Sequence, residues 1–167
     1  MVDANQIEID LYPLAEQVGA ALQARGLMLA SAESCTGGWV GEAMTAVPGS
    51  SKWFDRGFIT YTNLAKQEML GVSAATLAQH GAVSEQTVRE MVSGALAHSH
   101  AGIALAVSGI AGPGGETPGK PVGTVCFAWC LKGREPRSET QYFSGDRKQV
   151  RAQAVAHALR GALAELS

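Results

Sequence analysis

The chain has 167 residues, a formal net charge of −2 and a pI near 6.1, and hydrophobic residues make up 46% of it. This length suffices for one domain around a single core, without a disulfide framework or a zinc site to stabilise it. The small net charge and the absence of any long Lys/Arg run exclude an electrostatic surface for nucleic acid or an anionic membrane.

The cysteines indicate a reducing environment. Cys35, Cys126 and Cys130 are odd in number and form no Cys-x-x-Cys pair, so we expect free thiols and a cytoplasmic protein. Cys126 and Cys130 lie four residues apart in a predicted strand and are expected to share its core face. The N-terminus lacks the pattern of a signal peptide, and no run of 18 apolar residues predicts a membrane span.

In chain order, the first half predicts alternating helices and strands. We expect residues 1–10 to be an N-terminal extension and residues 11–167 to be one domain. Apolar spacing predicts a helix over 11–25, a buried strand over 27–30 and a second helix after Gly38. Pro48 and Gly49 predict a loop over 47–51, and residues 58–62 have strand composition.

The second half continues the alternation. Asn63 is the expected N-cap of a helix over 64–70, and Ser84 that of a helix after a short helical piece at 76–80. Residues 103–107 predict a central strand, and 122–131 with 138–143 predict a hairpin. Asp146 and Gln149 have the spacing of a capping box for the last helix. The predicted fold is therefore α/β, a single-domain three-layer α/β/α sandwich around a mixed β-sheet.

The stretch 29–38 is the first candidate site, because an apolar strand ends there in small hydroxyl residues and two glycines. A strand that turns into a helix presents side chains and free N–H groups at one edge of the sheet. Ser34 is thus a candidate nucleophile, and the amides from Cys35 to Gly38 are candidate oxyanion or phosphate donors. The alternative is an ordinary turn in which Ser34 or Thr36 caps the helix.

Lys66 is the second candidate. It falls in the first turn of a predicted helix, where a cation opposes the helix dipole and the ammonium is pushed toward its neutral form. Locally unfavourable placements concentrate at functional sites. The alternative is an exposed lysine, for which the same placement would cost little free energy.

A third candidate region follows the central strand. Residues 108–115 are the most glycine-dense part of the chain, and ligands of α/β sheets bind at such strand ends. The sequence from Gly114 to Lys120 resembles part of a phosphate-binding P-loop. However, Pro121 stands where Ser or Thr should hold magnesium, and a strand rather than a helix is expected next, so we reject that interpretation.

No set of His, Cys and carboxylate residues has the spacing of metal ligands, so we expect neither a metal nor a cofactor. The corresponding prediction is that EDTA leaves unchanged the rate of a reaction in which Ser34 is the nucleophile. Loss of activity in EDTA that is restored by one divalent metal would contradict a metal-free reaction.

Several unusual blocks occur in a distinctive order: 32–38, Pro48-Gly49-Ser50-Ser51, Tyr61-Thr62-Asn63 followed by Lys66, 108–113, 121–125 and 143–147. Over residues 12–165 this order resembles the CinA C-terminal-domain family, and within it the stand-alone nicotinamide-nucleotide amidases. These hydrolyse nicotinamide mononucleotide to nicotinate mononucleotide and ammonia in pyridine-nucleotide recycling.

The resemblance implies a catalytic set of Ser34, Tyr61 and Lys66, without a metal, and a homodimer or larger homo-oligomer. Lys66 is the expected base, and Tyr61 would relay a proton or bond the Ser34 oxygen. The expected substrate-binding residues are Cys35, Thr36, Gly37, Gly38, Ser50, Ser51, Arg56, Asn63, Ser108, Gly109, Ile110, Ala111 and Gly112. The rival hypothesis is a non-catalytic module that binds a partner protein in competence or recombination.

Overall fold

The computed structural model describes residues 8–167, so most of the expected N-terminal extension lies outside the described residues. Five strands form one sheet in the order β2-β1-β3-β4-β5. β1 (Leu29–Glu33) is parallel to β2 (Phe54–Ile59) and to β3 (Ile103–Gly109), whereas β4 (Thr124–Leu131) and β5 (Arg137–Tyr142) continue the sheet with antiparallel pairings. The expected mixed sheet is confirmed.

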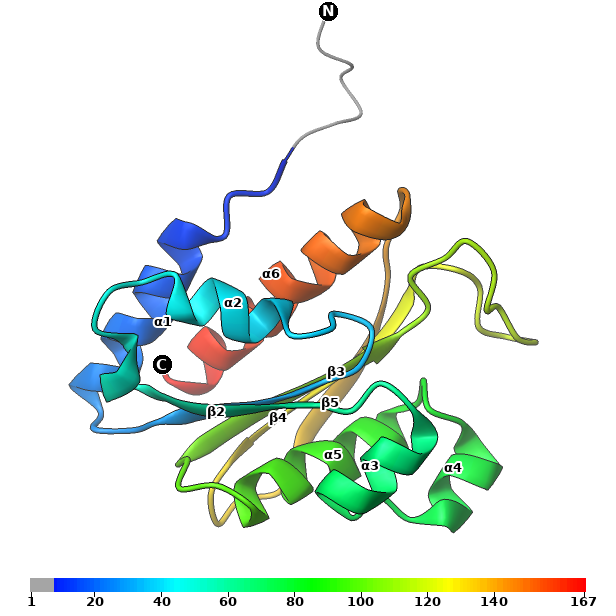
Figure 1. The fold of residues 1–167 in the computed structure, drawn as a ribbon, viewed down its shortest axis with the longest axis horizontal. Coiled ribbons are helices and arrows are strands. Elements are labelled where there is room, and N and C mark those ends of the chain that lie inside the picture. The colour runs from blue at the N-terminus through cyan, green and yellow to red at the C-terminus, as the bar shows by residue number, and fades with distance from the viewer. Residues whose placement is uncertain (1–7) are drawn as a thin grey trace, which may run out of the picture.

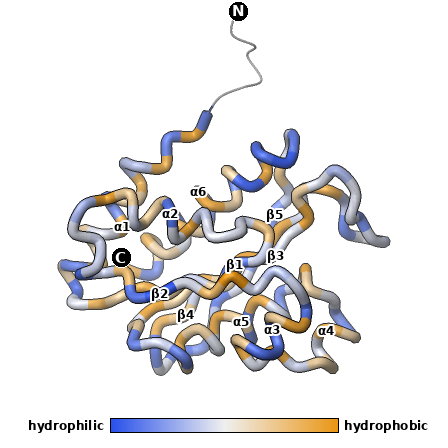
Figure 2. The backbone as a smooth tube through the Cα atoms, in the orientation of Figure 1, coloured by the Kyte–Doolittle hydropathy of each residue, from blue (hydrophilic) through white to orange (hydrophobic). Residues whose placement is uncertain are grey.

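Helices cover both faces of this sheet, as the predicted three-layer sandwich requires (Figure 1). One layer holds α1 (Tyr12–Ala24), α2 (Trp39–Thr45) and α6 (Arg147–Glu165), and the other holds α3 (Asn63–Leu70), α4 (Ala74–His80) and α5 (Glu85–Ala97). Apolar residues gather along the sheet between the layers (Figure 2). Within residues 8–167 no helix has the length and apolar character needed to cross a bilayer.

Several predicted boundaries are wrong by a few residues. β1 begins at Leu29 rather than at residue 27 and continues to Glu33, and β2 spans 54–59 rather than 58–62. The predicted loop at 47–51 overlaps a short 3₁₀ helix, Ser50–Lys52. Thr62, not Asn63, is the N-cap of α3: its backbone is extended and its side chain accepts the Ala65 N–H at 3.1 Å. Both residue types cap helices, so local propensity does not separate them.

Other local signals are confirmed. The Ser84 side chain caps α5, and Asp146 and Gln149 form the reciprocal hydrogen bonds of a capping box at the start of α6. Cys126 and Cys130 are buried in the same cluster between the sheet and α5, and all three cysteines are free thiols. A strand, not a helix, follows the glycine-rich loop, which supports the rejection of a P-loop.

Gly94 in α5 allows α3 and α5 to approach closely. A Cβ atom at this position would lie only 2.0 Å from the Leu70 carbonyl oxygen at the end of α3. The neighbouring atom belongs to the backbone, so no side-chain rotation can relieve the contact. The position of α3, and therefore of Lys66, depends on the absence of a side chain at residue 94.

We expect Gly94→Ala to lower the free energy of unfolding by roughly 1–3 kcal/mol, the usual cost of overpacking, and to reduce activity because α3 must move. Urea unfolding measures the stability. Ser93→Ala is the control, because Ser93 is exposed and its hydroxyl bonds only its own helix at Arg89. An unchanged unfolding midpoint for Gly94→Ala would contradict the tight contact.

Candidate active site

The topology brings three strand ends to one edge of the sheet. Because β1, β2 and β3 run in the same direction, the residues that end them lie side by side, on the right in Figure 1. The Ser34 N–H donates to the Val107 carbonyl at 3.0 Å, and the Thr60 N–H donates to the Glu33 carbonyl at 2.8 Å. The first candidate stretch thus lies between the end of β2 and the glycine-dense loop after β3.

Ser34 and Lys66 are in direct contact at this edge. Lys66 Nζ lies 3.1 Å from Ser34 Oγ, although the two residues are 32 positions apart. Ser34 is 7% exposed and Lys66 only 1%. Side chains of a helix point toward its N-terminus, which directs Lys66 from the first turn of α3 back over the end of β1. The hypothesis of an exposed Lys66 is therefore wrong.

The surroundings of Lys66 suit a neutral amine. Its Nζ donates to the Thr60 carbonyl at 3.0 Å and to the Tyr61 carbonyl at 3.4 Å, and within residues 8–167 it bonds no carboxylate. Burial lowers the pKa of Lys66. A neutral amine has two N–H donors for the two carbonyls, and its lone pair can then accept the Ser34 hydroxyl proton. The pair has the geometry of a nucleophile and its general base.

The neighbouring thiol is a poor competitor for this role. Cys35 is buried on the other face of the sheet, in the cluster beneath α1, α2 and α6. Burial raises the pKa of its thiol to about 12. Because the thiolate is the reactive form of cysteine, Cys35 stays inert at neutral pH.

Glu33 changes the expected use of the helix amides. Its buried carboxylate accepts the N–H groups of Val40 and Gly41 at 2.9 and 3.1 Å, and the Thr36 hydroxyl at 2.7 Å. It therefore supplies the cap that α2 lacks at Gly38. The alternative of Ser34 or Thr36 as N-cap is wrong, and the first turn of α2 is already satisfied by an anion.

Three amides before α2 remain available. Gly37 donates its N–H to the Ser34 carbonyl at 3.1 Å, but the N–H groups of Cys35, Thr36 and Gly38 donate to no other residue within the range 8–167. Arg151 of α6 holds this turn from behind through the Cys35 and Thr36 carbonyls, at 2.9 and 3.1 Å. The free amides of Cys35 and Thr36 directly follow Ser34, the place where an oxyanion hole is built.

Tyr61 lies at the mouth of the site, and its hydroxyl does not bond Ser34. The residue is 59% exposed, and its hydroxyl accepts a hydrogen bond from Arg147 Nη2 at 3.1 Å. Arg147 also donates to the Gly112 carbonyl at 2.9 Å. Arg147 therefore joins the end of β2 to the glycine-rich loop across the opening.

The remaining predicted binding residues divide into two groups. Ser108, Gly109, Ile110, Ala111 and Gly112 continue β3 directly beside Ser34. Asn63 is exposed at the start of α3, near Lys66 in the chain.

The second group lies at the opposite end of the strands. Ser50 and Ser51 belong to the 3₁₀ helix that precedes β2, next to the point where the Leu29 N–H bonds the Trp53 carbonyl. Arg56 pairs with Ala30, near the start of β1, and contacts Asp55 and the His98 carbonyl. The structure therefore does not bring these three residues to Ser34. Neither the loop motif of Ser50 and Ser51 nor the sequence around Arg56 indicates which end of the sheet these residues occupy.

The edge that carries Ser34 holds charged groups of both signs. The N-termini of α3 and α6 lie at this edge because these helices follow the ends of β2 and β5. The N-terminus of α5 also lies at this edge, because α5 runs back to the opposite edge, where β3 starts. Helix N-termini carry partial positive charge. The side chains of Arg147 and Arg151 add two full charges. Carboxylates of Glu33, Glu85 and Asp146 occupy the starts of α2, α5 and α6, so the attraction for an anion comes from the two arginines.

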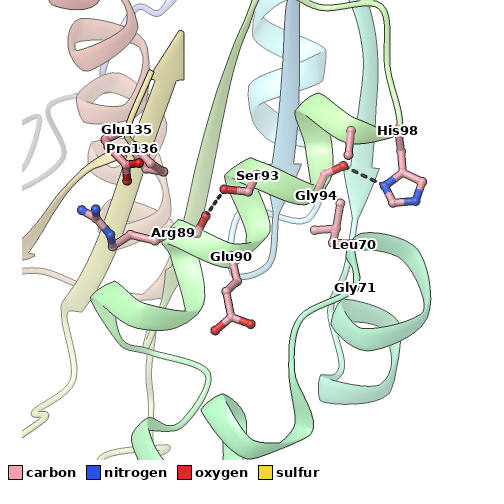
Figure 3. A pocket seen from close by; sticks show the side chains of 10 residues that line it. Leu70, Gly71, Arg89, Glu90, Ser93, Gly94, His98, Glu135 and Pro136 are labelled. Atoms are coloured by element: carbon pink, nitrogen blue, oxygen red, sulfur yellow. Dashed lines mark hydrogen bonds between the residues drawn. The ribbon is translucent and has the colours of Figure 1, made fainter. Parts of the chain in front are cut away.

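An open groove of about 490 Å³ elsewhere on the molecule does not include these residues. It runs along the outer side of α5, beside the end of α3 and the β4–β5 turn (Figure 3). Its Ser93 hydroxyl and His98 Nδ1 bond carbonyls of the same helix, at 2.9 and 2.8 Å. Arg89, Glu90 and Glu135 also line this groove, which lies away from Ser34 and Lys66. Within residues 8–167, no three His, Cys, Asp or Glu side chains gather into a potential metal site.

Sequence reasoning missed Glu33, Arg147 and Arg151. Glu33 is adjacent to Ser34, but strand alternation places it on the opposite face, so only the path of α2 reveals its partners. Arg147 belongs to the block 143–147, one of the blocks that resemble the CinA C-terminal-domain family, so that resemblance was the available signal. Arg151 had no local signal, because its role depends on α6 packing behind the turn.

Comparisons with known proteins place the chain in a family. The family model described as "CinA C-terminal domain" matches residues 11–166. The chain is 55% identical over 151 residues to the nicotinamide-nucleotide amidohydrolase PncC of Escherichia coli (strain K12), covering 90% of this chain and 92% of that protein. It is 52% identical to a putative competence-damage inducible protein of Symbiobacterium thermophilum, covering 90% of this chain but 37% of that longer protein.

A solved structure shows the same fold. The crystal structure of the competence/damage inducible protein CihA from Agrobacterium tumefaciens superposes with a TM-score of 0.90 at 44% identity. The match covers 95% of this chain and 96% of that one.

Proposed function

Because the chain belongs to the CinA C-terminal domain family, we propose that it is an amidohydrolase that converts nicotinamide mononucleotide to nicotinate mononucleotide and ammonia. The observation that carries the proposal is the buried contact of 3.1 Å between Lys66 Nζ and Ser34 Oγ, beside two unpaired amides. A nucleophile, a base and an oxyanion hole are the parts that amide hydrolysis requires. Relatives named as amidohydrolases supply the substrate class.

The proposed reaction proceeds through an acyl-enzyme. Neutral Lys66 takes the Ser34 proton while Ser34 Oγ attacks the carboxamide carbon, and the N–H groups of Cys35 and Thr36 stabilise the negative oxygen. Lys66 returns the proton to the leaving nitrogen, the C–N bond breaks and ammonia departs. Water then loses a proton to Lys66 and attacks the ester. As the ester C–O bond breaks, Lys66 passes this proton to Ser34 Oγ, and the product acid leaves and ionises in solvent.

Glu33 and Arg151 are positioning residues in this scheme. Glu33 fixes the start of α2 and the Thr36 side chain, and Arg151 fixes the carbonyls of the turn, so the two amides are oriented before substrate binds. Donors that need no reorganisation stabilise the transition state most effectively.

An ammonia-release assay on the purified chain with nicotinamide mononucleotide tests the proposal. Stoichiometric ammonia and nicotinate mononucleotide are expected. No turnover would favour the rival hypothesis of a non-catalytic module that binds a partner protein. The intact contact between Ser34 and Lys66 disfavours that alternative, since a binding module has no need of a buried lysine.

We assign the substrate phosphate to the guanidinium of Arg147. It lies at the mouth of the site, and its present acceptors are a phenol and a carbonyl rather than an anion. Arginine binds phosphate through two parallel N–H groups.

We expect Arg147→Ala to raise KM for nicotinamide mononucleotide about tenfold or more while kcat changes little, because a phosphate contact remote from the reacting carbon contributes equally to substrate and transition state. Lys148→Ala is the matched control: it removes a neighbouring charge whose side chain is 73% exposed and paired with Glu8. An equal rise in KM for both variants would indicate a general charge effect instead.

The biological setting extends the same proposal. The reaction would recycle pyridine nucleotides in the cytoplasm, and the protein would act as a homodimer or larger homo-oligomer. Free thiols at all three cysteines agree with a reducing compartment. Light scattering of the purified chain tests the oligomeric state.

A further inference from the structure

A buried hydroxyl that takes no part in the proposed reaction scheme lies beside Ser34. Ser108 belongs to β3 and is 1% exposed. Val107 is paired with Glu33 in parallel register, and the Ser34 N–H bonds the Val107 carbonyl. Ser108 is therefore the neighbour of Ser34 on the adjacent strand.

The two serine side chains occupy the same face of the sheet. Along β3, Leu105 and Val107 belong to the cluster beneath α1, α2 and α6, whereas Ala104 and Ala106 belong to the cluster facing α5. Side chains alternate along a strand, so Ser108 points to the side of α3 and α5, where Lys66 meets Ser34. Because β1 lies between β2 and β3, Lys66 flanks Ser34 on one side and Ser108 flanks it on the other.

The Ser108 hydroxyl has no hydrogen-bond partner among residues 8–167, in contrast to its buried neighbours. The Ser84 hydroxyl bonds the Gly81 carbonyl at 2.9 Å, and the Thr124 hydroxyl bonds the Pro121 carbonyl at 2.7 Å. The Ser108 oxygen keeps some solvent contact, since among residues 8–167 the one fully enclosed side-chain N or O atom without a partner is Trp53 Nε1. The hydroxyl is therefore free to bond a substrate held at Ser34.

We propose that the Ser108 hydroxyl accepts an N–H of the substrate carboxamide and so orients the amide for attack, an inference that rests on the proposed function. The substrate oxygen is directed to the Cys35 and Thr36 amides. In a planar carboxamide the nitrogen is bonded to the same carbon as the oxygen and points in a different direction from it. Ser108 supplies a hydrogen-bond acceptor for this nitrogen on the β3 side of Ser34. Ser108 thus selects carboxamides over carbonyl compounds that have no N–H.

An ester of the same acid tests this assignment, because an ester can react with Ser34 but has no N–H to donate. The probes are nicotinamide mononucleotide and the methyl ester of nicotinate mononucleotide. Ser108→Ala is expected to lower kcat/KM for the amide by about 10-fold to 100-fold, the usual effect of one lost hydrogen bond in a desolvated site, and to leave the ester rate within about threefold. Ser108→Cys, of similar volume but with a weak acceptor, should show the same selectivity loss.

The control is Ser138→Ala, which removes a hydroxyl from β5 that bonds Glu85 rather than the site. It should leave the ratio of amide to ester rates unchanged. Equal losses on both substrates in Ser108→Ala and Ser108→Cys would assign Ser108 a structural role and overturn the inference, as would full amide activity in both. An inactive wild-type chain would instead overturn the proposed function, and this inference with it.

Discussion

Replacing Ser34 with alanine is expected to abolish deamidation while the protein still binds nicotinamide mononucleotide. Removing the nucleophile of a serine hydrolase typically lowers kcat by about 10⁴–10⁶-fold. The loss of one hydroxyl leaves the strand and the two amides in place, because the backbone of Ser34 is held by the Val107 carbonyl. Ammonia release measures kcat, and calorimetric titration measures substrate binding.

The matched control is Ser31→Ala, which makes the same substitution in the same strand. Ser31 is buried, but its hydroxyl lies on the face of Glu33, at 3.5 Å from that carboxylate, and not on the face of Lys66. Its kcat should stay within about threefold of the wild-type value. If Ser34→Ala kept more than a tenth of wild-type kcat, Ser34 would have no place in the mechanism.

Exchanging Lys66 for arginine is the second change with a very large expected effect. Arginine keeps the positive charge and much of the length, but it stays protonated throughout the accessible pH range. If Lys66 is the base, kcat for Lys66→Arg falls to near zero. If Lys66 acts only through its charge, KM rises modestly and kcat is largely kept.

The same assignment predicts the direction of the pH profile. Burial lowers the pKa of Lys66, so its neutral form appears at a lower pH than for an exposed lysine. The neutral amine is the active form of a base. The value of kcat/KM should therefore rise with pH and level off once Lys66 has lost its proton.

Lys120→Arg is the control for both measurements. Lys120 donates to the His80 carbonyl at 2.7 Å and makes no hydrogen bond to Ser34. Its replacement should leave kcat and the pH profile unchanged. Substantial kcat in Lys66→Arg would refute the base assignment and move proton transfer to another group.

The roles expected for Tyr61 and the α2 amides show where local reasoning reached its limit. The spacing of Tyr61 and Lys66 in the chain is short, which favours a joint role. Yet the two side chains diverge: Lys66 turns inward over β1, and the Tyr61 hydroxyl points out to Arg147. Likewise, the N-terminus of α2 is a reasonable anion site until the Glu33 carboxylate is found there.

The sequence by itself determined the layered α/β fold, the helix caps at Ser84 and Asp146, and the candidacy of Ser34 and Lys66. Those features rest on hydrophobic period, capping chemistry and helix electrostatics, which act over a few residues. Only the tertiary structure decided which candidates meet. The order β2-β1-β3 places Lys66 and Ser108, which are 32 and 74 positions from Ser34 in the chain, on the two sides of the Ser34 hydroxyl. The same order leaves Ser50, Ser51 and Arg56 at the other end of the strands. Strand order and direction are set by the packing of the whole core, and no local pattern encodes them.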